Sequence, residues 1–204
     1  MLDLLITVSC CAVALAMRPW RSLGAAGPPW PWLAWWLVLP LFWSADRLAA
    51  SAVLQPLSGV PLLVLMAGWP LTVLALLPTA LLTGWLAQLD GWETLHRLVW
   101  LGLMPAVLVM GLGAAVRRLL PHHLFVYILG RGFFATQFAC ALAGGLALWA
   151  NGVPTGLAGG ELMVARWLSA WGDAFLTGMF VAIFVAFKPE WLATYSDRLY
   201  LPRN

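Results

Sequence analysis

Residues 165–180 read ARWLSAWGDAFLTGMF, and they place one carboxylate, Asp173, inside an apolar stretch of membrane-helix length. The polar side chains recur at intervals of three, four and four residues, so a helix would carry them on one face. A carboxylate near the middle of a membrane costs several kcal/mol unless a cation, a hydrogen-bond donor or water meets it. We therefore expect Asp173 to face the interior of a helical bundle, either in a structural ion pair or in a transport role. The residues of this face are Arg166, Ser169, Asp173 and Thr177.

The rest of the chain is similarly apolar. Of its 204 residues, 63% are hydrophobic and only 9% are charged, against about 25% in soluble domains. A soluble domain of this size would need a charged exterior, so lipid has to serve as the solvent, and residues 1–204 are expected to form one transmembrane domain. The net charge of +3 is scattered, with no basic run longer than Arg117-Arg118, which indicates cytoplasmic loops and no nucleic-acid partner.

Apolar stretches of helical length predict an all-α, polytopic transmembrane bundle of about seven helices. A bilayer core is crossed by about 20 helical residues. Two of the stretches are short and are joined at Gly68-Trp69-Pro70, so they form either one kinked helix or two half-length passes; their combined length of about 48 Å favours two. The helices are expected at 2–17, 32–53, 57–69, 71–88, 98–116, 124–149 and 164–187.

The basic residues predict the orientation of this bundle. With seven crossings and the N-terminus outside, one side receives Arg47, Arg97 and Arg166, each with a carboxylate nearby (Asp46, Glu93 and Glu161). Such an asymmetry is typical of a multi-pass protein of the bacterial cytoplasmic (inner) membrane, with lipid around it and its C-terminus in the cytoplasm. The cytoplasmic side receives the larger basic set: Arg18, Arg21, Arg117, Arg118, Lys188, Arg198 and Arg203.

The stretch 124–149 offers a partner for Asp173. Arg131 would lie about 10 Å inside the cytoplasmic edge and Asp173 about 14 Å inside the opposite edge, which leaves a gap of about 6 Å in a core of about 30 Å. An arginine side chain spans such a gap, so we expect the sixth and seventh helices to pack closely and to be bridged by Arg131 and Asp173. Small residues recur every four positions on the sixth helix and would allow this approach: Gly132, Thr136, Cys140 and Gly144.

Histidines and cysteines are the other candidates for chemistry. His122 and His123 follow Pro121 at the start of the sixth helix, where they cap the helix, reach the interface or bind a metal; adjacent helical positions diverge by about 100°, which disfavours a shared ion. Cys10 and Cys11 are either small core residues or weak candidates for copper(I), which prefers soft donors. The sequence contains no HExxH, GxSxG or P-loop motif, so no enzyme activity is expected, and ATP hydrolysis would need another subunit.

Several motifs are shared with a known family. Residues 120–128 read LPHHLFVYI, residues 132–134 read GFF, residues 173–179 read DAFLTGM, and the tail continues from KPEWL at 188–192 to Tyr200-Leu201. Together with PLSGVPLLVLMAG at 56–68, they resemble the predicted energy-coupling-factor transporter permeases related to CbiM, the substrate-capture subunit of cobalt and nickel importers. The resemblance extends over about two thirds of the chain, and its specific part is C-terminal.

This resemblance implies an all-helical permease subunit that works beside a second transmembrane subunit and cytoplasmic ATPases, with a transition-metal ion as substrate and no other cofactor. Members of the family begin Met-His and grip the metal there, whereas this chain begins Met1-Leu2-Asp3. The family's histidine at the start of its third helix falls on Pro56. Both departures remove nitrogen ligands suited to cobalt or nickel. Two functions therefore stay open: capture of a metal ion or small solute, and a non-transporting scaffold or assembly factor whose metal site is lost.

Overall fold

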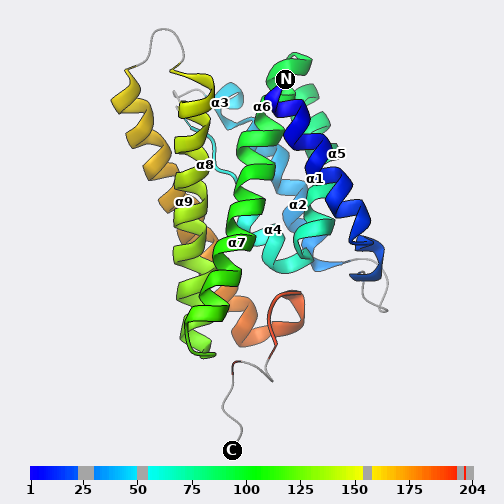
Figure 1. The fold of residues 1–204 in the computed structure, drawn as a ribbon, viewed down its shortest axis with the longest axis vertical. Coiled ribbons are helices and arrows are strands. Elements are labelled where there is room, and N and C mark those ends of the chain that lie inside the picture. Colours follow the sequence, from blue (N-terminus) through cyan, green and yellow to red (C-terminus); the bar gives the residue numbers. More distant parts are fainter. Residues whose placement is uncertain (23–29, 50–54, 154–157, 197–199, 201–204) are drawn as a thin grey trace, which may run out of the picture.

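The computed structural model describes residues 1–22, 30–49, 55–153, 158–196 and 200, and all secondary structure within these ranges is helical (Figure 1). Two π-helical segments continue into longer helices: η2 (Leu98–Leu103) joins α6 to α7, and η3 (Val126–Phe134) leads into α8. The α-helices are α1 (Leu2–Ala16), α2 (Pro31–Trp43), α3 (Ala45–Leu48), α4 (Val60–Ala67), α5 (Trp69–Leu86), α6 (Gly91–Arg97), α7 (Met104–Leu119), α8 (Ala135–Asn151) and α9 (Gly159–Phe187). Two short 3₁₀ turns are η1 (Pro19–Ser22) and η4 (Pro189–Trp191).

Four continuous helices of the described part are long and apolar enough to cross a membrane, while α1 and α2 are apolar but shorter. Together with the low charge content they indicate a membrane protein, in agreement with the composition. Two of these helices begin earlier than the sequence pattern predicts, at Gly91 and at Gly159. The four are Trp69–Leu86, Gly91–Leu119, Val126–Asn151 and Gly159–Phe187.

The second predicted helix is shorter than expected. Continuous α-helix ends at Trp43, and after Ser44 only the single turn of α3 follows. Residues 50–53 of the predicted stretch 32–53 lie outside the described ranges. The short helix α4 and the longer α5 are separate, as the sequence favoured, and Gly68 between them has a φ of 80°, a conformation that glycine adopts at little cost.

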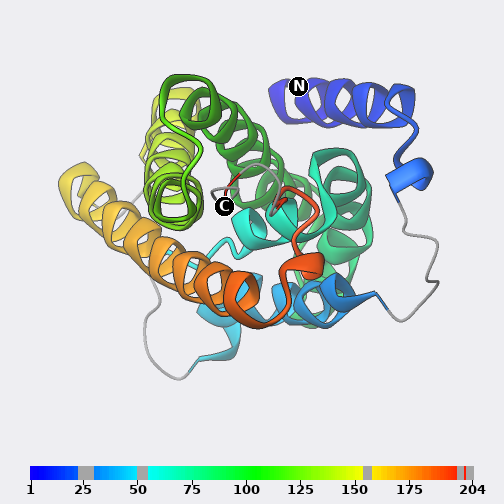
Figure 2. The ribbon, with the colours of Figure 1, turned by 90° about the horizontal axis from the view of Figure 1, so that it is seen from below.

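Helix α8 runs antiparallel to α7 and to α9, whereas α6 continues through η2 into α7 in the same direction (Figure 1). The N-terminus of the chain, α3, α6 and the first turn of α9 lie at one end, which we call the N-terminal end of the bundle. The last turn of α7 and the last turn of α9 lie at the opposite end. In Figure 2, α1 lies at the periphery and α4 lies near the centre.

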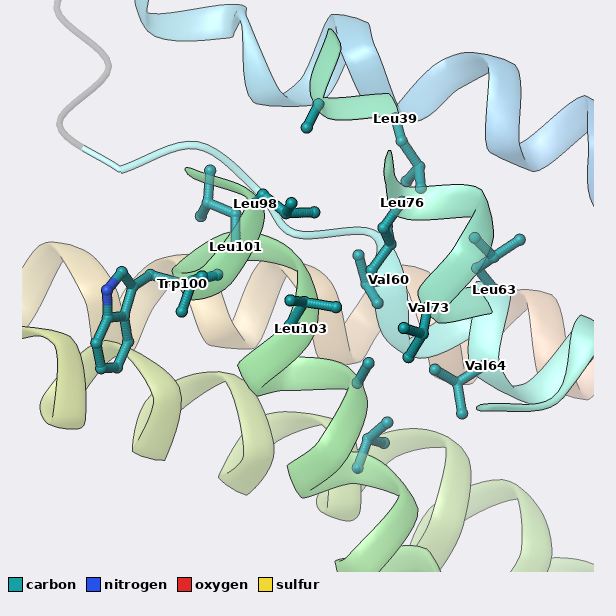
Figure 3. Packing of buried hydrophobic residues seen from close by; sticks show 14 of the residues in the cluster. Leu39, Val60, Leu63, Val64, Val73, Leu76, Leu98, Trp100, Leu101 and Leu103 are labelled. Carbon is teal, nitrogen blue, oxygen red and sulfur yellow. The ribbon is translucent and has the colours of Figure 1, made fainter. Parts of the chain in front are cut away.

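Helix α4 is the centre of the core. All eight of its residues are buried, which fits a helix that is apolar on every side. One side packs into the cluster formed with α2, α5 and η2, and the other side packs against Tyr127 and Val181. Figure 3 shows the larger cluster, with Leu39, Val60, Leu63, Val64, Val73, Leu76, Leu98, Trp100, Leu101 and Leu103.

Helices α8 and α9 pack closely along the predicted stripe of small residues. A methyl group at Gly132 would lie 3.2 Å from Val181, and one at Gly144 would lie 3.2 Å from Arg166. Larger side chains at these positions would push α9 away. The predicted close packing of the sixth and seventh helices is therefore confirmed.

Candidate functional site

Asp173 lies at the midpoint of α9, with fourteen residues of the helix on each side. Its side chain is 2% exposed and faces the interior of the bundle, as predicted. Oδ1 accepts a hydrogen bond from the backbone N–H of Gly59 at 2.7 Å, and Oδ2 accepts one from Ser58 at 3.0 Å. Because these N–H groups directly precede α4, Asp173 caps that helix at its positive end.

The predicted bridge between Arg131 and Asp173 is wrong. Nη1 of Arg131 donates to the carbonyl of Thr194 at 3.4 Å, and its guanidinium lies 5.9 Å from the ring of Tyr127. Among the described residues, no ion pair joins it to a carboxylate. The prediction failed because Asp173 obtains its donors from backbone N–H groups, which the sequence pattern had assigned to a continuous helix from residue 57.

The segment 55–59 is unwound and lies against the core. Non-helical backbone at membrane depth needs partners for its polar groups. Trp43 donates its indole N–H to the carbonyl of Ser58 at 2.9 Å, and Trp35 donates to that of Gly59 at 2.7 Å. Gly59 itself has a φ of 64°, in the left-handed region that favours glycine. Both tryptophans come from α2, so α2 and α9 together fix the entry to α4.

Two hydroxyl groups complete the support of this segment. Ser169 of α9 donates to the carbonyl of Pro56 at 3.2 Å. Ser58 donates to the carbonyl of Leu101 at 2.7 Å, within the π-helix η2. The predicted polar face of α9 thus serves the unwound segment twice, through Ser169 and Asp173.

A cavity of about 200 Å³ lies between this segment, α8, α9 and the helix that runs from α6 into η2. It occupies the N-terminal end of the bundle, since its lining includes residues of α3, α6 and the first part of α9. Trp100, Leu101 and Pro105 form an apolar wall. The charged or titratable lining comprises Asp46, Glu93, His96, Arg97, Arg166 and Asp173.

Arg97 holds the two carboxylates at the rim of the cavity. Its guanidinium donates to both oxygens of Asp46, at 2.7 and 2.6 Å, and to Glu93 at 3.0 Å. Arg47 donates to Glu93 at 3.0 Å, and its Nε lies 4.0 Å from Oδ2 of Asp46, so both predicted pairs are present within one network of two arginines and two carboxylates. Burial raises the pKa of Asp46, but the hydrogen bonds and charge of Arg97 lower it by more, and the pKa lies below its ordinary value.

Arg166 has no such partner within the described part of the chain. Its Nη1 donates to the carbonyl of Gly144, and its Nε is buried without a hydrogen-bond partner. Glu161, the carboxylate expected nearby, is exposed, and no ion pair joins the two. Arg166 therefore lines the cavity with an uncompensated positive charge.

Asp3 is a buried residue to which the sequence pattern gave no role. It is 3% exposed; its Oδ2 lies 3.0 Å from Nδ1 of His96, and its Oδ1 accepts from the indole of Trp100 at 3.1 Å. His96 and Trp100 are four residues apart on one helical face and both line the cavity, so Asp3 positions them from behind. The available signal was a carboxylate in the first turn of an otherwise apolar helix.

The remaining predicted site residues do not line the cavity. Thr177 is buried one turn beyond Asp173. His122 and His123 are exposed before η3, and Nδ1 of His123 accepts from the backbone N–H of Phe125 at 3.3 Å. Cys10 and Cys11 are half-buried in α1. Within the described ranges, no three His, Cys, Asp or Glu side chains are placed to share a metal ion.

Comparison with known proteins gives no relative from which a function can be transferred. No family model, no curated protein and no solved structure matches the chain. The interpretation of the cavity therefore depends on its own geometry.

Proposed function

We propose that this chain is a permease-like subunit that binds its substrate in the cavity beside Asp173. The observation that supports the proposal is a broken helix: α4 begins near the membrane midpoint, after an unwound segment that lines a polar cavity. Transporters commonly bind solutes at such discontinuous helices, because half-helix ends and unwound backbone supply polar groups there. A bundle with a purely mechanical role would gain more stability from apolar packing at this position.

The proposed topology has seven passes, with the half-length α4 counted as one, the N-terminus outside and the C-terminus in the cytoplasm of a bacterium. Arg117, Arg118 and Lys188 lie at the end opposite the cavity, as the positive-inside rule requires for this orientation. The cavity would then receive its substrate from outside. Because the sequence has no P-loop, a second transmembrane subunit and cytoplasmic ATPases of the energy-coupling-factor type would supply the energy.

The substrate in this proposal is a transition-metal ion or a small solute, and retention of a ligand tests it. The purified protein is incubated with a mixture of Co²⁺, Ni²⁺, Cu⁺ and growth-medium metabolites and then washed. Elemental analysis and mass spectrometry identify what stays bound. We expect one stoichiometric ligand on the wild type and its loss in Ser169→Phe, which fills the cavity.

The matched control is Leu168→Phe, which adds the same ring on the exposed face of α9 one position away. It should retain the ligand. Equal retention by Ser169→Phe, or no ligand on the wild type, would contradict the proposal.

A scaffold or assembly factor is the second candidate, and a specific observation favours it. The carboxylates that line the cavity already have protein donors: Asp173 is held by two backbone N–H groups, and Asp46 and Glu93 are held by arginines. A ligand cation would have to displace those donors. If the scaffold role is right, Ser169→Phe should be folded and as active as the wild type in supporting assembly of its partner subunits.

A further inference from the structure

We propose that the cavity takes a small organic anion, with one carboxylate bound by Arg166. This inference depends on the proposed function and narrows its substrate from a metal ion or solute to a carboxylate-bearing solute. It follows from comparing how each charge on the cavity wall is compensated.

Every lining carboxylate already has its counter-charge or donors. Asp46 and Glu93 share Arg97, and Glu93 also pairs with Arg47. Asp173 accepts hydrogen bonds from two backbone N–H groups at the positive end of α4. A cation entering the cavity would find no carboxylate without partners among these three.

Arg166 is the lining charge that lacks compensation in the described part of the chain. A guanidinium has five N–H donors, and here a single hydrogen bond, to the carbonyl of Gly144, is formed. Its Nε is shielded from solvent, and therefore also from a ligand, so a ligand would bind through the Nη atoms. A carboxylate satisfies two guanidinium donors at once through parallel hydrogen bonds.

The number of uncompensated charges favours a carboxylate over a phosphate. A carboxylate brings one negative charge to the one uncompensated cation. A phosphate ester brings up to two, beside a wall that already carries Asp46, Glu93 and Asp173. Because like charges repel, the second negative charge of a phosphate would be unfavourable beside these carboxylates, and a monoanion fits the cavity wall better.

The volume of the cavity and its apolar wall indicate what the ligand carries besides its carboxylate. A volume of about 200 Å³ is slightly larger than an engineered cavity of about 150 Å³ that binds benzene. Trp100, Leu101 and Pro105 offer apolar surface opposite the polar groups. A short aliphatic or small aromatic carboxylic acid matches both features.

The charge preference is measured with two thiol reagents of similar size. Sulfonatoethyl methanethiosulfonate is anionic and trimethylammonioethyl methanethiosulfonate is cationic; each forms a mixed disulfide with a thiolate and releases methanesulfinate. The thiol is introduced by Ser169→Cys, on the cavity wall one turn from Arg166. Peptide mass spectrometry reads each site separately, so the native cysteines stay in place. The ratio of the two rates cancels the intrinsic reactivity of the thiol.

The matched reference is Asn151→Cys, an exposed position at the same end of the bundle. We expect the anion-to-cation rate ratio in Ser169→Cys to exceed the reference ratio roughly tenfold. Adding Arg166→Gln should bring it down to the reference, while Arg166→Lys, which keeps the charge, should preserve it. A ratio equal to or below the reference, or one unchanged by Arg166→Gln, would overturn the inference.

Benzoate, benzamide and benzylamine then serve as competitors that share one ring and differ in charge. Benzoate should slow labelling in Ser169→Cys at a concentration at least tenfold lower than the other two. If benzylamine protects best, or all three protect alike, the anion assignment is wrong. A metal ion retained by the wild type and lost in Ser169→Phe would leave the proposed function standing while ending this narrower one.

Discussion

The two ends of α4 are held by different chemistry. At its N-terminal end, side chains do the work: the Asp173 carboxylate accepts from two N–H groups, and tryptophans donate to the carbonyls. At its C-terminal end, the backbone N–H groups of Ala193 and Thr194 donate to the carbonyls of Met66 at 3.2 Å and Leu65 at 3.3 Å. A charged cap therefore lies at the midpoint of α9 beside the cavity, while a neutral backbone cap closes the end nearer the cytoplasmic side of the proposed topology.

The largest effect is expected from removing the charged cap. Asp173→Ala leaves the N–H groups of Ser58 and Gly59 without acceptors inside the bundle, which should lower the free energy of unfolding by about 3 kcal/mol. Asp173→Asn keeps one acceptor and should lose less. Thermal unfolding in detergent, followed by near-ultraviolet circular dichroism, measures both. Glu161→Ala, on the exposed first turn of α9, is the control and should leave the midpoint unchanged.

The same variant tests the absence of a bridge to Arg131. Because Arg131 and Asp173 have separate partners, the effects of Arg131→Ala and Asp173→Ala should add within about 0.5 kcal/mol. A double variant that is more stable than the two single effects predict would show that Arg131 and Asp173 interact, contrary to the structure.

A smaller loss is expected at the carbonyl side of the same end. Trp43→Phe removes the indole donor to the carbonyl of Ser58 but keeps an aromatic ring, and should cost about 1–2 kcal/mol. Trp92→Phe, at an exposed position of α6, serves as the control. If both variants have the same thermal unfolding midpoint in detergent, the buried hydrogen bond makes no net contribution to stability.

The C-terminal end of α4 should lose less stability when a side-chain hydrogen bond is removed. The Thr194 hydroxyl lies 3.1 Å from the carbonyl of Leu65 and 2.9 Å from the hydroxyl of Tyr127. Thr194→Val removes both interactions, yet the backbone cap remains, so the expected loss is about 1 kcal/mol. Thr194→Ser should restore most of the stability. A loss as large as that of Asp173→Ala would mean that both ends of α4 depend equally on side-chain hydrogen bonds.

The smallest effect is expected from pH at the cavity rim. The pKa of Asp46 is lower in the folded protein than the ordinary value of about 3.9. Its carboxylate therefore stabilises the fold above about pH 4, and this contribution is lost as the pH falls through the lower folded pKa. The difference in melting temperature between wild type and Asp46→Asn should be constant from neutral pH to about 5 and shrink below 4. A difference independent of pH would contradict this role.

Much of the fold could be predicted because lipid makes the pattern simple. Apolar stretches mark the helices, the carboxylate at Asp173 has to face inward, and the small residues at Gly132 and Gly144 mark where α9 approaches. The structure confirms these predictions because each of them depends only on the residues of one helix and on whether lipid or protein surrounds them.

The site was harder to predict because many of its interacting residues lie far apart in the sequence. Gly59 and Pro61 are local signals for a helix that begins near Val60, but nothing local shows which acceptor the N–H groups of Ser58 and Gly59 find. The sequence placed Asp46 beside Arg47, and this pair is present, but the closer pair between Asp46 and Arg97 joins residues 51 apart and has no local signal. Asp3 becomes a buried partner of His96 only once α1 packs beside α6.

Helix α9 and the chain that follows it hold α4 at both ends, through Asp173 on one side and Ala193 and Thr194 on the other. Helix α4 is therefore tied to α9 and its tail by hydrogen bonds, to α2 through Trp35 and Trp43, and to α5 by the chain at Gly68. A methyl group at Gly68 would meet no atom within 4 Å, so a substitution there is opposed by the φ of 80° and not by a clash.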